Sequence, residues 1–247
     1  MKLVSWNVGG RRARLEDQIR AVLRQDADLV CLQEVRASTA GRWREALASE
    51  GLGQIADSSE RSDRRLFNLT ATHWPLATLE TPGLPQPERL LSVRVRSSHG
   101  PVEVHNLHVP PLNQGTAKLE TLSAVHDVLA VPSSAHRILC GDLNTARAES
   151  VADAPERRGR WVEAEGLVLR DLGEWDLEDV FLRLHGYRRN EVSCSTAGHW
   201  RKRGHRLDHI FASRDLGAVF CDYQHGWRQE GFSDHSAMEA IFEPSPR

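Results

Sequence analysis

An aspartate and a histidine stand side by side in GFSDHSAMEAIF, residues 231–242, just before an apolar run typical of a strand. Gly231, Ser233 and Asp234 are ordinary turn formers, so a polar turn accounts for them. A turn does not account for His235, whose imidazole titrates near neutral pH and suits acid–base or phosphate chemistry beside a carboxylate. Because the chain has 12 histidines, this pair needs support from other residues before it indicates a site.

Other polar side chains stand at the ends or beginnings of predicted strands. In an open α/β sheet the carboxyl ends of parallel strands share one edge, where ligands bind. The beginning of an antiparallel strand lies at that same edge, so we expect these side chains to meet in one cleft. The set comprises Asn7, Glu34, His108, Asp142, Asn144, Asp208, Asp234 and His235.

Carboxylates gathered in one cleft repel one another unless a cation lies among them. Oxygen donors from Glu, Asp and Asn suit Mg²⁺ or Mn²⁺, whereas zinc prefers cysteine and histidine in tetrahedral sets. A metal of this kind, a carboxylate base and a histidine together suit phosphate ester hydrolysis, in which developing charge is neutralised and water is activated. The set therefore predicts a metal-dependent phosphoesterase.

Each residue also has an ordinary interpretation when it is taken alone. Asn7 could simply precede the Gly9–Gly10 turn, and Glu34 could be a solvent-facing strand end. The Asp of GDLN could bond its own backbone, and His108 could be a satisfied buried histidine. The occurrence of all these residues together favours a site, because unrelated turns would not all be expected at strand ends that lie at one edge.

The elements that must position these residues alternate along the chain. Apolar patterns predict strands over 2–8 and 28–34, a helix from Leu15, and a second helix capped by Thr39 and stopped by Gly51. Strands are then predicted at LFNLTAT, RLLSVRVR, VEVHNLHV and RILCGD, with helices from Thr116 and around EWDLEDVFLRLHG, followed by strands at EVSCST, RLDHIFAS, AVFCDY and SAMEAIF. A mixed sheet, or two sheets packed together under helices, fits this order.

Length and composition describe one soluble α/β domain over residues 1–247. Hydrophobic content is 40%, charged content 27% and mean hydropathy −0.48. The beginning of the chain lacks the pattern of a signal peptide and no segment is long and apolar, so we expect a cytoplasmic monomer without membrane contact. No C-x-x-C pair occurs among the four cysteines, which disfavours a zinc site.

Five motifs carry a resemblance to a known superfamily. SWN at 5–7, LQE at 32–34, GDLN at 141–144, RLDH at 206–209 and SDH at 233–235 resemble, in order and spacing, the endonuclease/exonuclease/phosphatase superfamily. The resemblance spans nearly the whole chain. It implies a four-layer α/β/β/α sandwich, with two mixed sheets packed face to face and helices outside, and metal-dependent phosphoesterase activity.

The resemblance also implies a role for each matched residue. Glu34 corresponds to the main metal ligand, with Asn7 and Asp234 around the metal, which would be Mg²⁺ or Mn²⁺. Asp142 would activate or orient the attacking water with Asn144 as its partner. His235 would contact the scissile phosphate, held in its tautomer by Asp208.

Within the superfamily, LEDVFLRLHG, EVSCST and HWRKRGHRLDH resemble the second half of exonuclease III-type abasic-site endonucleases, which favours a DNA substrate. Two features depart from that branch. His108 stands in HVP where those enzymes carry Tyr, as in pancreatic-type deoxyribonucleases and many of the phosphatases, and would serve as general acid; EVSCST lacks the expected aromatic residues. A stacking and phosphate-binding edge could be formed by Trp200, Arg201, Lys202, Arg203 and Arg206, with a solvated loop as the alternative.

The prediction from sequence is therefore an Mg²⁺-dependent DNA endonuclease or exonuclease, with action at abasic sites in DNA repair as one form of it. The alternative is a metal-dependent phosphatase or phosphodiesterase acting on nucleotide, lipid or sugar phosphates, which His108 and the net charge of −2 favour. A binding module without catalysis is disfavoured because no residue of the core set is missing.

Overall fold

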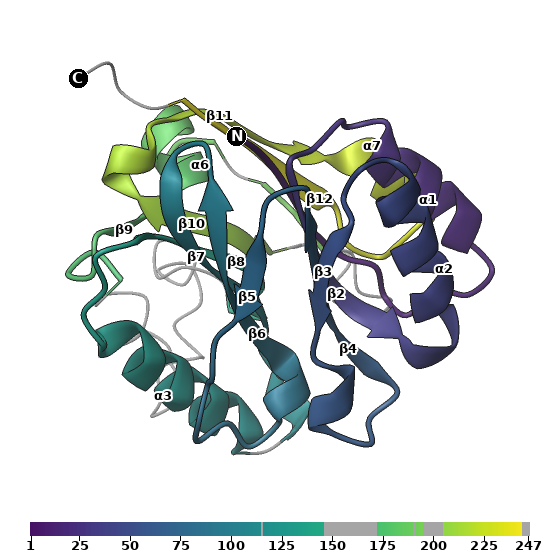
Figure 1. Ribbon diagram of the computed structural model, residues 1–247, viewed down its shortest axis with the longest axis horizontal. Helices are drawn as coiled ribbons and strands as arrows, with labels where there is room; N and C mark the ends of the chain where they lie inside the picture. The colour runs from purple at the N-terminus through teal and green to yellow at the C-terminus, as the bar shows by residue number, and fades with distance from the viewer. Residues whose placement is uncertain (115, 146–171, 190, 195–204, 244–247) are drawn as a thin grey trace.

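The computed structural model describes residues 1–247 except 115, 146–171, 190, 195–204 and 244–247, and its described strands form two six-stranded sheets (Figure 1). The first sheet has the order β11-β12-β1-β2-β4-β3 and the second β5-β6-β7-β8-β10-β9. The first comprises β1 (Lys2–Asn7), β2 (Leu29–Arg36), β3 (Gln54–Asp57), β4 (Leu66–Thr72), β11 (Ala218–Gln224) and β12 (Ala237–Phe242). The second comprises β5 (Leu76–Thr78), β6 (Leu90–Ser97), β7 (Gly100–His108), β8 (His136–Asp142), β9 (Leu177–Asp179) and β10 (Asp208–Ser213).

Helices lie on the outer faces of the two sheets (Figure 1). The first sheet is covered by α1 (Leu15–Leu23), α2 (Ala37–Ser49) and α7 (His225–Gln229), and the second by α3 (Ala117–Ala130), with α6 (Val180–His185) at one end. Short 3-10 turns occur at η1 (Ser59–Arg61), η2 (Pro87–Arg89), η3 (Leu112–Gln114) and η6 (Arg214–Leu216). The expected four-layer α/β/β/α sandwich is confirmed.

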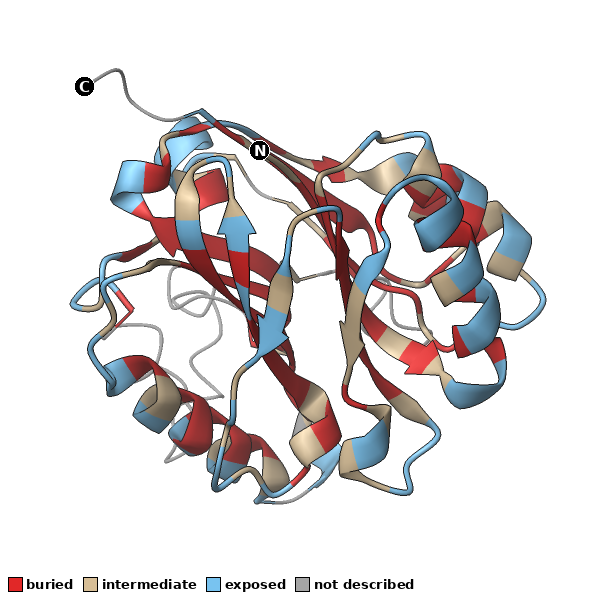
Figure 2. Ribbon diagram, viewed as in Figure 1, coloured by how far each residue is buried: buried red, intermediate tan, exposed pale blue. Residues whose placement is uncertain are grey.

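Three apolar clusters separate these four layers. The central cluster joins Leu3 and Cys31 of the first sheet to Val104 and Ile138 of the second. One outer cluster joins the first sheet to α1, α2 and α7, and the other joins the second sheet to α3. Figure 2 shows most strands buried, the edge strands β3 and β5 more exposed, and the outward faces of the helices exposed. Strands covered on both faces explain why apolar runs such as LVCL, rather than strict alternation, mark them in the sequence.

Strand directions bring the predicted polar residues to one edge. β1 and β2 are parallel, as are β7 and β8, so Asn7, His108 and Asp142 end their strands on the same side. β10 runs antiparallel to β8, and its first residue, Asp208, is paired with Asp142. β12 runs antiparallel to β1, which places the residues before it, including His235, at the same edge.

Local details differ from the predicted elements. α2 begins at Ala37 and Thr39 lies inside it, where its hydroxyl donates to the Arg36 carbonyl at 3.0 Å instead of capping the helix. Gly51 follows the helix with a φ of +86°, as a stop signal requires. The strand expected at EVSCST has only isolated bridges from Cys194, to His205 and His235, in its described part.

Two further observations concern the shortest strands and the search for membrane-spanning helices. β3, β5 and β9 are too short, at three or four residues, to show a periodic pattern in the sequence. Among the described residues, no helix is long and apolar enough to cross a membrane.

Candidate active site

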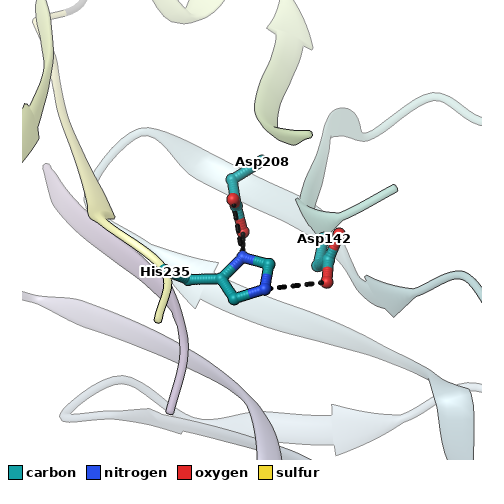
Figure 3. Close-up of side chains that lie close together, drawn as sticks. All are labelled: Asp142, Asp208 and His235. Atoms are coloured by element: carbon teal, nitrogen blue, oxygen red, sulfur yellow. Dashed lines mark hydrogen bonds and ion pairs between the residues drawn. The ribbon is translucent and has the colours of Figure 1, made fainter. Parts of the chain in front are cut away.

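Asp142, Asp208 and His235 meet at the edge shared by the two sheets (Figure 3). Nδ1 of His235 lies 2.9 Å from Oδ2 of Asp208, and Nε2 of the same ring lies 3.7 Å from Oδ2 of Asp142. All three side chains are buried. The imidazole is therefore placed between two carboxylates, one at each ring nitrogen.

The turn before β12 fixes the position of His235. The Ser233 hydroxyl donates to the Asn7 carbonyl at 2.7 Å and accepts the His235 N–H at 3.2 Å. The Trp6 indole donates to the His235 carbonyl at 2.9 Å. The turn formers of SDH thus hold the backbone, which leaves the imidazole ring free to face the two carboxylates.

The two carboxylates determine the charge of the cluster. Burial opposes protonation of His235, but Asp208 and Asp142 outweigh it and raise the pKa of the imidazole well above its ordinary value. Burial raises the pKa of Asp142 to about 7, with His235 acting in the opposite direction and Asp208 adding to the rise. The cluster therefore favours an imidazolium beside Asp208.

Asn7 bridges this cluster to Glu34. Its Nδ2 donates to Oδ2 of Asp142 at 3.0 Å and lies 3.3 Å from Oε1 of Glu34, while its Oδ1 accepts the Gly9 N–H at 2.9 Å. Asn7 is fully buried. A single amide thus holds two carboxylates at a fixed separation across the gap between the sheets.

Glu34 does not end its strand, as the sequence suggested, but lies within β2, which runs on to Arg36. The pairing of β2 with β4 shifts between Leu32 and Val35, and Glu34 has a φ of +56°. A bulge of this kind re-aims a side chain and is common beside active sites, and a positive φ is strained for a non-glycine residue. The bulge turns the carboxylate towards the cleft.

His108 and Arg89 form the opposite side of the cluster. Nε2 of His108 lies 3.4 Å from Oε1 of Glu34, and Nη1 of Arg89 lies 3.0 Å from Nδ1 of His108. Burial lowers the pKa of His108 well below its ordinary value, and Arg89 and His235 add to that effect. Arg89 was not predicted from the sequence, where it is one of many arginines; its position directly before β6, a strand of the same sheet as His108, was the one available signal.

Asn144 continues the site beyond β8. Its Nδ2 donates to the Val109 carbonyl at 2.9 Å and lies 3.3 Å from Oδ2 of Asp142. Its φ is +47°, and its carbonyl accepts a hydrogen bond from Nζ of the buried Lys118 at 2.7 Å. The side chain of Asn144 therefore contacts and supports Asp142, and the hydrogen bond from Lys118 of α3 holds its strained backbone in place.

The remaining predicted residues lie apart from the buried cluster. Asp234 lines the cleft at its rim, where it pairs with Arg11 at 3.3 Å. The guanidinium of Arg206 pairs with Asp179 at 2.7 Å and its side chain is 11% exposed, so it does not line the cleft. The rest of the predicted basic edge, Trp200, Arg201, Lys202 and Arg203, lies outside the described residues.

The cluster forms one side of a cleft of about 570 Å³. Glu34, His108, Asp142, Asn144 and His235 line it together with a second wall from η2, the loop before β4 and the beginning of β4. That wall contributes Asp63, Arg64, Arg65, Asn68, Glu88 and Arg89. The cleft thus combines acidic groups at its base with arginines along one wall.

The donor set fits a divalent cation that prefers oxygen. Among the described residues, carboxylate oxygens of Asp142 and Asp208 and a ring nitrogen of His235 lie within 4.8 Å of one another, with the imidazolium as a counter-charge rather than a metal ligand. Glu34 and Asp142 also approach the same Asn7 amide. Carboxylates this close repel unless a cation or proton compensates them, and hard oxygen donors select Mg²⁺- or Mn²⁺-like ions.

Comparison with known proteins agrees with this geometry. Residues 4–235 match the model of the Endonuclease/Exonuclease/phosphatase family. No curated protein sequence matches the chain.

Three solved structures are similar over nearly the whole chain. An AP endonuclease from Archaeoglobus fulgidus is 19% identical with a TM-score of 0.79, covering 98% of this chain and 99% of that one. The 3′ phosphatase NExo from Neisseria, bound to a product DNA hairpin, is 21% identical with a TM-score of 0.74 and covers 98% and 99%. The APE2 catalytic domain from Xenopus laevis is 20% identical with a TM-score of 0.72 and covers 98% and 91%.

Proposed function

The chain belongs to the Endonuclease/Exonuclease/phosphatase family and is a hydrolytic phosphoesterase, and on that premise we propose that it cleaves phosphodiester bonds of DNA with Mg²⁺ or Mn²⁺. The observation that carries the proposal is His235, buried between Asp208 and Asp142 at the edge of a cleft with arginines along one wall. An imidazolium stabilised in this way donates a hydrogen bond to a phosphoryl oxygen.

Glu34 and Asp234 are the residues that would hold the metal in this proposal, with Asn7 beside it, where its Nδ2 orients the Glu34 carboxylate. Glu34 offers a carboxylate turned into the cleft by its bulge, and Asp234 offers a second one at the rim. When bound, the ion would neutralise charge on the phosphate and on the departing oxygen.

The buried cluster would act on water and phosphate. Asp142, whose carboxylate contacts the Asn7 and Asn144 amides, would accept a proton from the attacking water or orient it. Asp208 would keep the proton of His235 on Nδ1, so that Nε2–H faces the phosphate. His108, beside Arg89 and Glu34, would face the leaving oxygen as its hydrogen-bond or proton donor.

DNA as substrate is supported by two observations. Similar structures include an AP endonuclease and a 3′ phosphatase bound to a product DNA hairpin. Arg64, Arg65 and Arg89 along the cleft supply cations for a phosphate backbone. We propose action at abasic sites and a part in DNA repair as the forms of this activity to test first. We also propose that the protein is a single-domain monomer.

A second candidate is hydrolysis of small phosphate esters, such as those of nucleotides, lipids or sugars. The feature that favours it is His108, which stands where the abasic-site branch carries tyrosine. The net charge of −2 also gives little long-range attraction for a polyanion.

The test uses end-labelled duplex DNA, one copy undamaged and one with a central abasic site, with Mg²⁺ or with a chelator. We expect metal-dependent cutting by the wild type and none by Asp142→Asn. Asp127→Asn, which changes a carboxylate that is 80% exposed on α3, is the matched control and should cut like the wild type. Glu34→Gln should require about tenfold more metal for half-maximal activity. Intact DNA in every lane, with turnover of small esters, would select the second candidate.

A further inference from the structure

One carboxylate of the cleft has no part in the cluster described above. Glu88 lies in η2, lines the cleft and is 2% exposed. Neither of its carboxylate oxygens accepts a hydrogen bond from any described residue. The nearest charge is Nε of Arg64, 3.2 Å from Oε1, on a side chain that is 56% exposed.

The backbone around Glu88 is held firmly. The Ser58 hydroxyl donates to the Glu88 carbonyl at 2.6 Å, and Nδ2 of Asn68 donates to the carbonyl of Arg89 at 2.8 Å. Ser58 and Asn68 are themselves buried. The backbone that carries the carboxylate is therefore held in a fixed position at the wall of the cleft.

Another buried carboxylate of the chain, that of Asp179, has hydrogen-bond donors. Asp179 accepts hydrogen bonds from both Arg206 and the Leu182 N–H. A buried acceptor without donors costs free energy, and a charged one costs more. The unbonded carboxylate of Glu88 therefore lowers the stability of the fold, and its acceptors become available to a molecule that displaces the exposed side chain of Arg64.

The charge of Glu88 limits what that molecule can present. A carboxylate repels phosphate oxygens, so a phosphate would bind instead beside the neighbouring Arg89, whose guanidinium lies 3.0 Å from His108. The group against Glu88 must be neutral and must donate hydrogen bonds. In a nucleotide these donors are a sugar hydroxyl or an amino group of a base.

We propose that Glu88 is a specificity residue, which accepts a hydrogen bond from a neutral O–H or N–H donor of the nucleotide adjoining the scissile phosphate. This inference rests on the proposed function. A site built around such an acceptor rejects an analogue that lacks the donor, because the carboxylate is then left buried and unbonded. A hydrogen bond to a charged group corresponds to about 10- to 100-fold in kcat/KM.

The experiment measures kcat/KM on two matched pairs of duplexes. One pair carries an abasic deoxyribose, with its C1′ hydroxyl, or the tetrahydrofuran analogue that lacks this hydroxyl. The other pair carries cytosine, or 2-pyrimidinone without the amino group, next to the cleaved phosphate. Wild type, Glu88→Leu and Glu88→Gln are compared, with Glu60→Gln as a control on an exposed carboxylate of neighbouring η1.

We expect the wild type to prefer the donor-bearing member of one pair by about 10- to 100-fold, and Glu88→Leu to reduce that ratio to about one. Glu88→Gln, which keeps one acceptor and the side-chain shape, should retain part of it, and Glu60→Gln all of it. The pair that responds tells whether the donor is a sugar hydroxyl or a base amino group.

Two results would overturn the inference. Equal loss on both members of each pair would make Glu88 a support for Arg64 or Arg89 rather than a specificity residue. A wild type that cuts DNA with no preference in either pair would reject the inference alone, whereas a wild type that cuts no DNA would reject the proposed function as well.

Discussion

Two buried Asp–His pairs lie next to one another in this molecule, and their members Asp208 and His209 are consecutive residues. In the cleft, Nδ1 of His235 lies 2.9 Å from Oδ2 of Asp208. Behind it, Nδ1 of His209 lies 3.5 Å from Oδ2 of Asp179. Both imidazoles are buried, yet the pKa of His235 is raised and that of His209 is lowered.

The third partner of each pair accounts for this difference. His235 faces a second carboxylate, Asp142, which favours the imidazolium. Burial lowers the pKa of His209, and Arg206, which shares the carboxylate of Asp179, lowers it further. The charge beside an Asp–His pair therefore decides whether the pair acts in catalysis or in stability. Substitutions in the first pair are expected to lower activity, and substitutions in the second to lower stability.

The largest effect is expected from His235→Ala, which should lower the turnover rate by about 10⁴-fold because it removes the donor to the phosphate. His209→Leu, the matched change in the other pair, should leave the turnover of folded protein within threefold. Single-turnover rates at saturating metal measure both. Comparable losses in the two variants would contradict the division of roles.

Asp208→Asn should lower kcat by about 10³-fold with little change in KM, because an amide does not hold His235 in the same tautomer and charge state. Asp179→Asn should lower stability instead and leave kcat unchanged in the protein that remains folded. Steady-state kinetics and urea unfolding on both variants separate the outcomes. A rise in KM alone for Asp208→Asn would assign Asp208 to substrate binding.

Arg206→Met should lower the free energy of unfolding by about 3 kcal/mol, since it leaves Asp179 buried without its cation. Burial opposes ionisation of Asp179, but His209 and Arg206 outweigh it and hold the pKa of the carboxyl below its ordinary value of 3.8. A depressed carboxyl pKa stabilises the fold above about pH 4, and that stability is lost as the pH falls.

His209 adds to this pH dependence. The folded protein binds its proton less readily than the unfolded chain, whose histidine titrates near 6.5, so stability decreases as the pH falls below that value. The contribution of His209 to stability should therefore rise with pH below 6.5, whereas Asp142, with its pKa raised to about 7, makes a contribution of the opposite sign. Urea unfolding between pH 3 and 7 measures the sum of the two. His209→Leu should make stability rise less with pH below 6.5 than it does in the wild type, and an unchanged curve would show that His209 is not held neutral.

Arg206 also shows where sequence reasoning about the site ends. Its place as the first residue of RLDH, directly after a basic segment, suits a phosphate-binding edge and an internal ion pair equally well, because composition does not reveal side-chain direction. The structure pairs it with Asp179, which the sequence presents only as part of a helical pattern. By contrast, most of the longer strands and the convergence of Asn7, His108 and Asp142 at one edge were expected from apolar runs and strand polarity, although the order of the strands within each sheet was not.

Backbone conformation in the site was equally impossible to predict from the sequence. The bulge at Glu34 depends on how β2 pairs with β4, two strands far apart in the sequence, and no local pattern announces a φ of +56°. Arg89 reaches His108 across neighbouring strands, and Glu88 is buried by residues of η1 and β4. Such features arise from tertiary packing, so they are found only when the fold is in hand.

The smallest effect is expected from Tyr223→Phe, which tests whether the two pairs are independent. Its hydroxyl donates to the Asp208 carbonyl at 2.7 Å, and the same side chain lies near the guanidinium of Arg206. Loss of this one hydrogen bond should lower stability by about 1 kcal/mol and kcat by less than threefold. A double-mutant cycle should couple Tyr223→Phe to Arg206→Met in stability and show additivity with His235→Ala. Coupling to His235→Ala instead would mean that changes at the Asp179–His209 pair alter the cleft through Tyr223. The two Asp–His pairs would then not have separate roles in stability and catalysis.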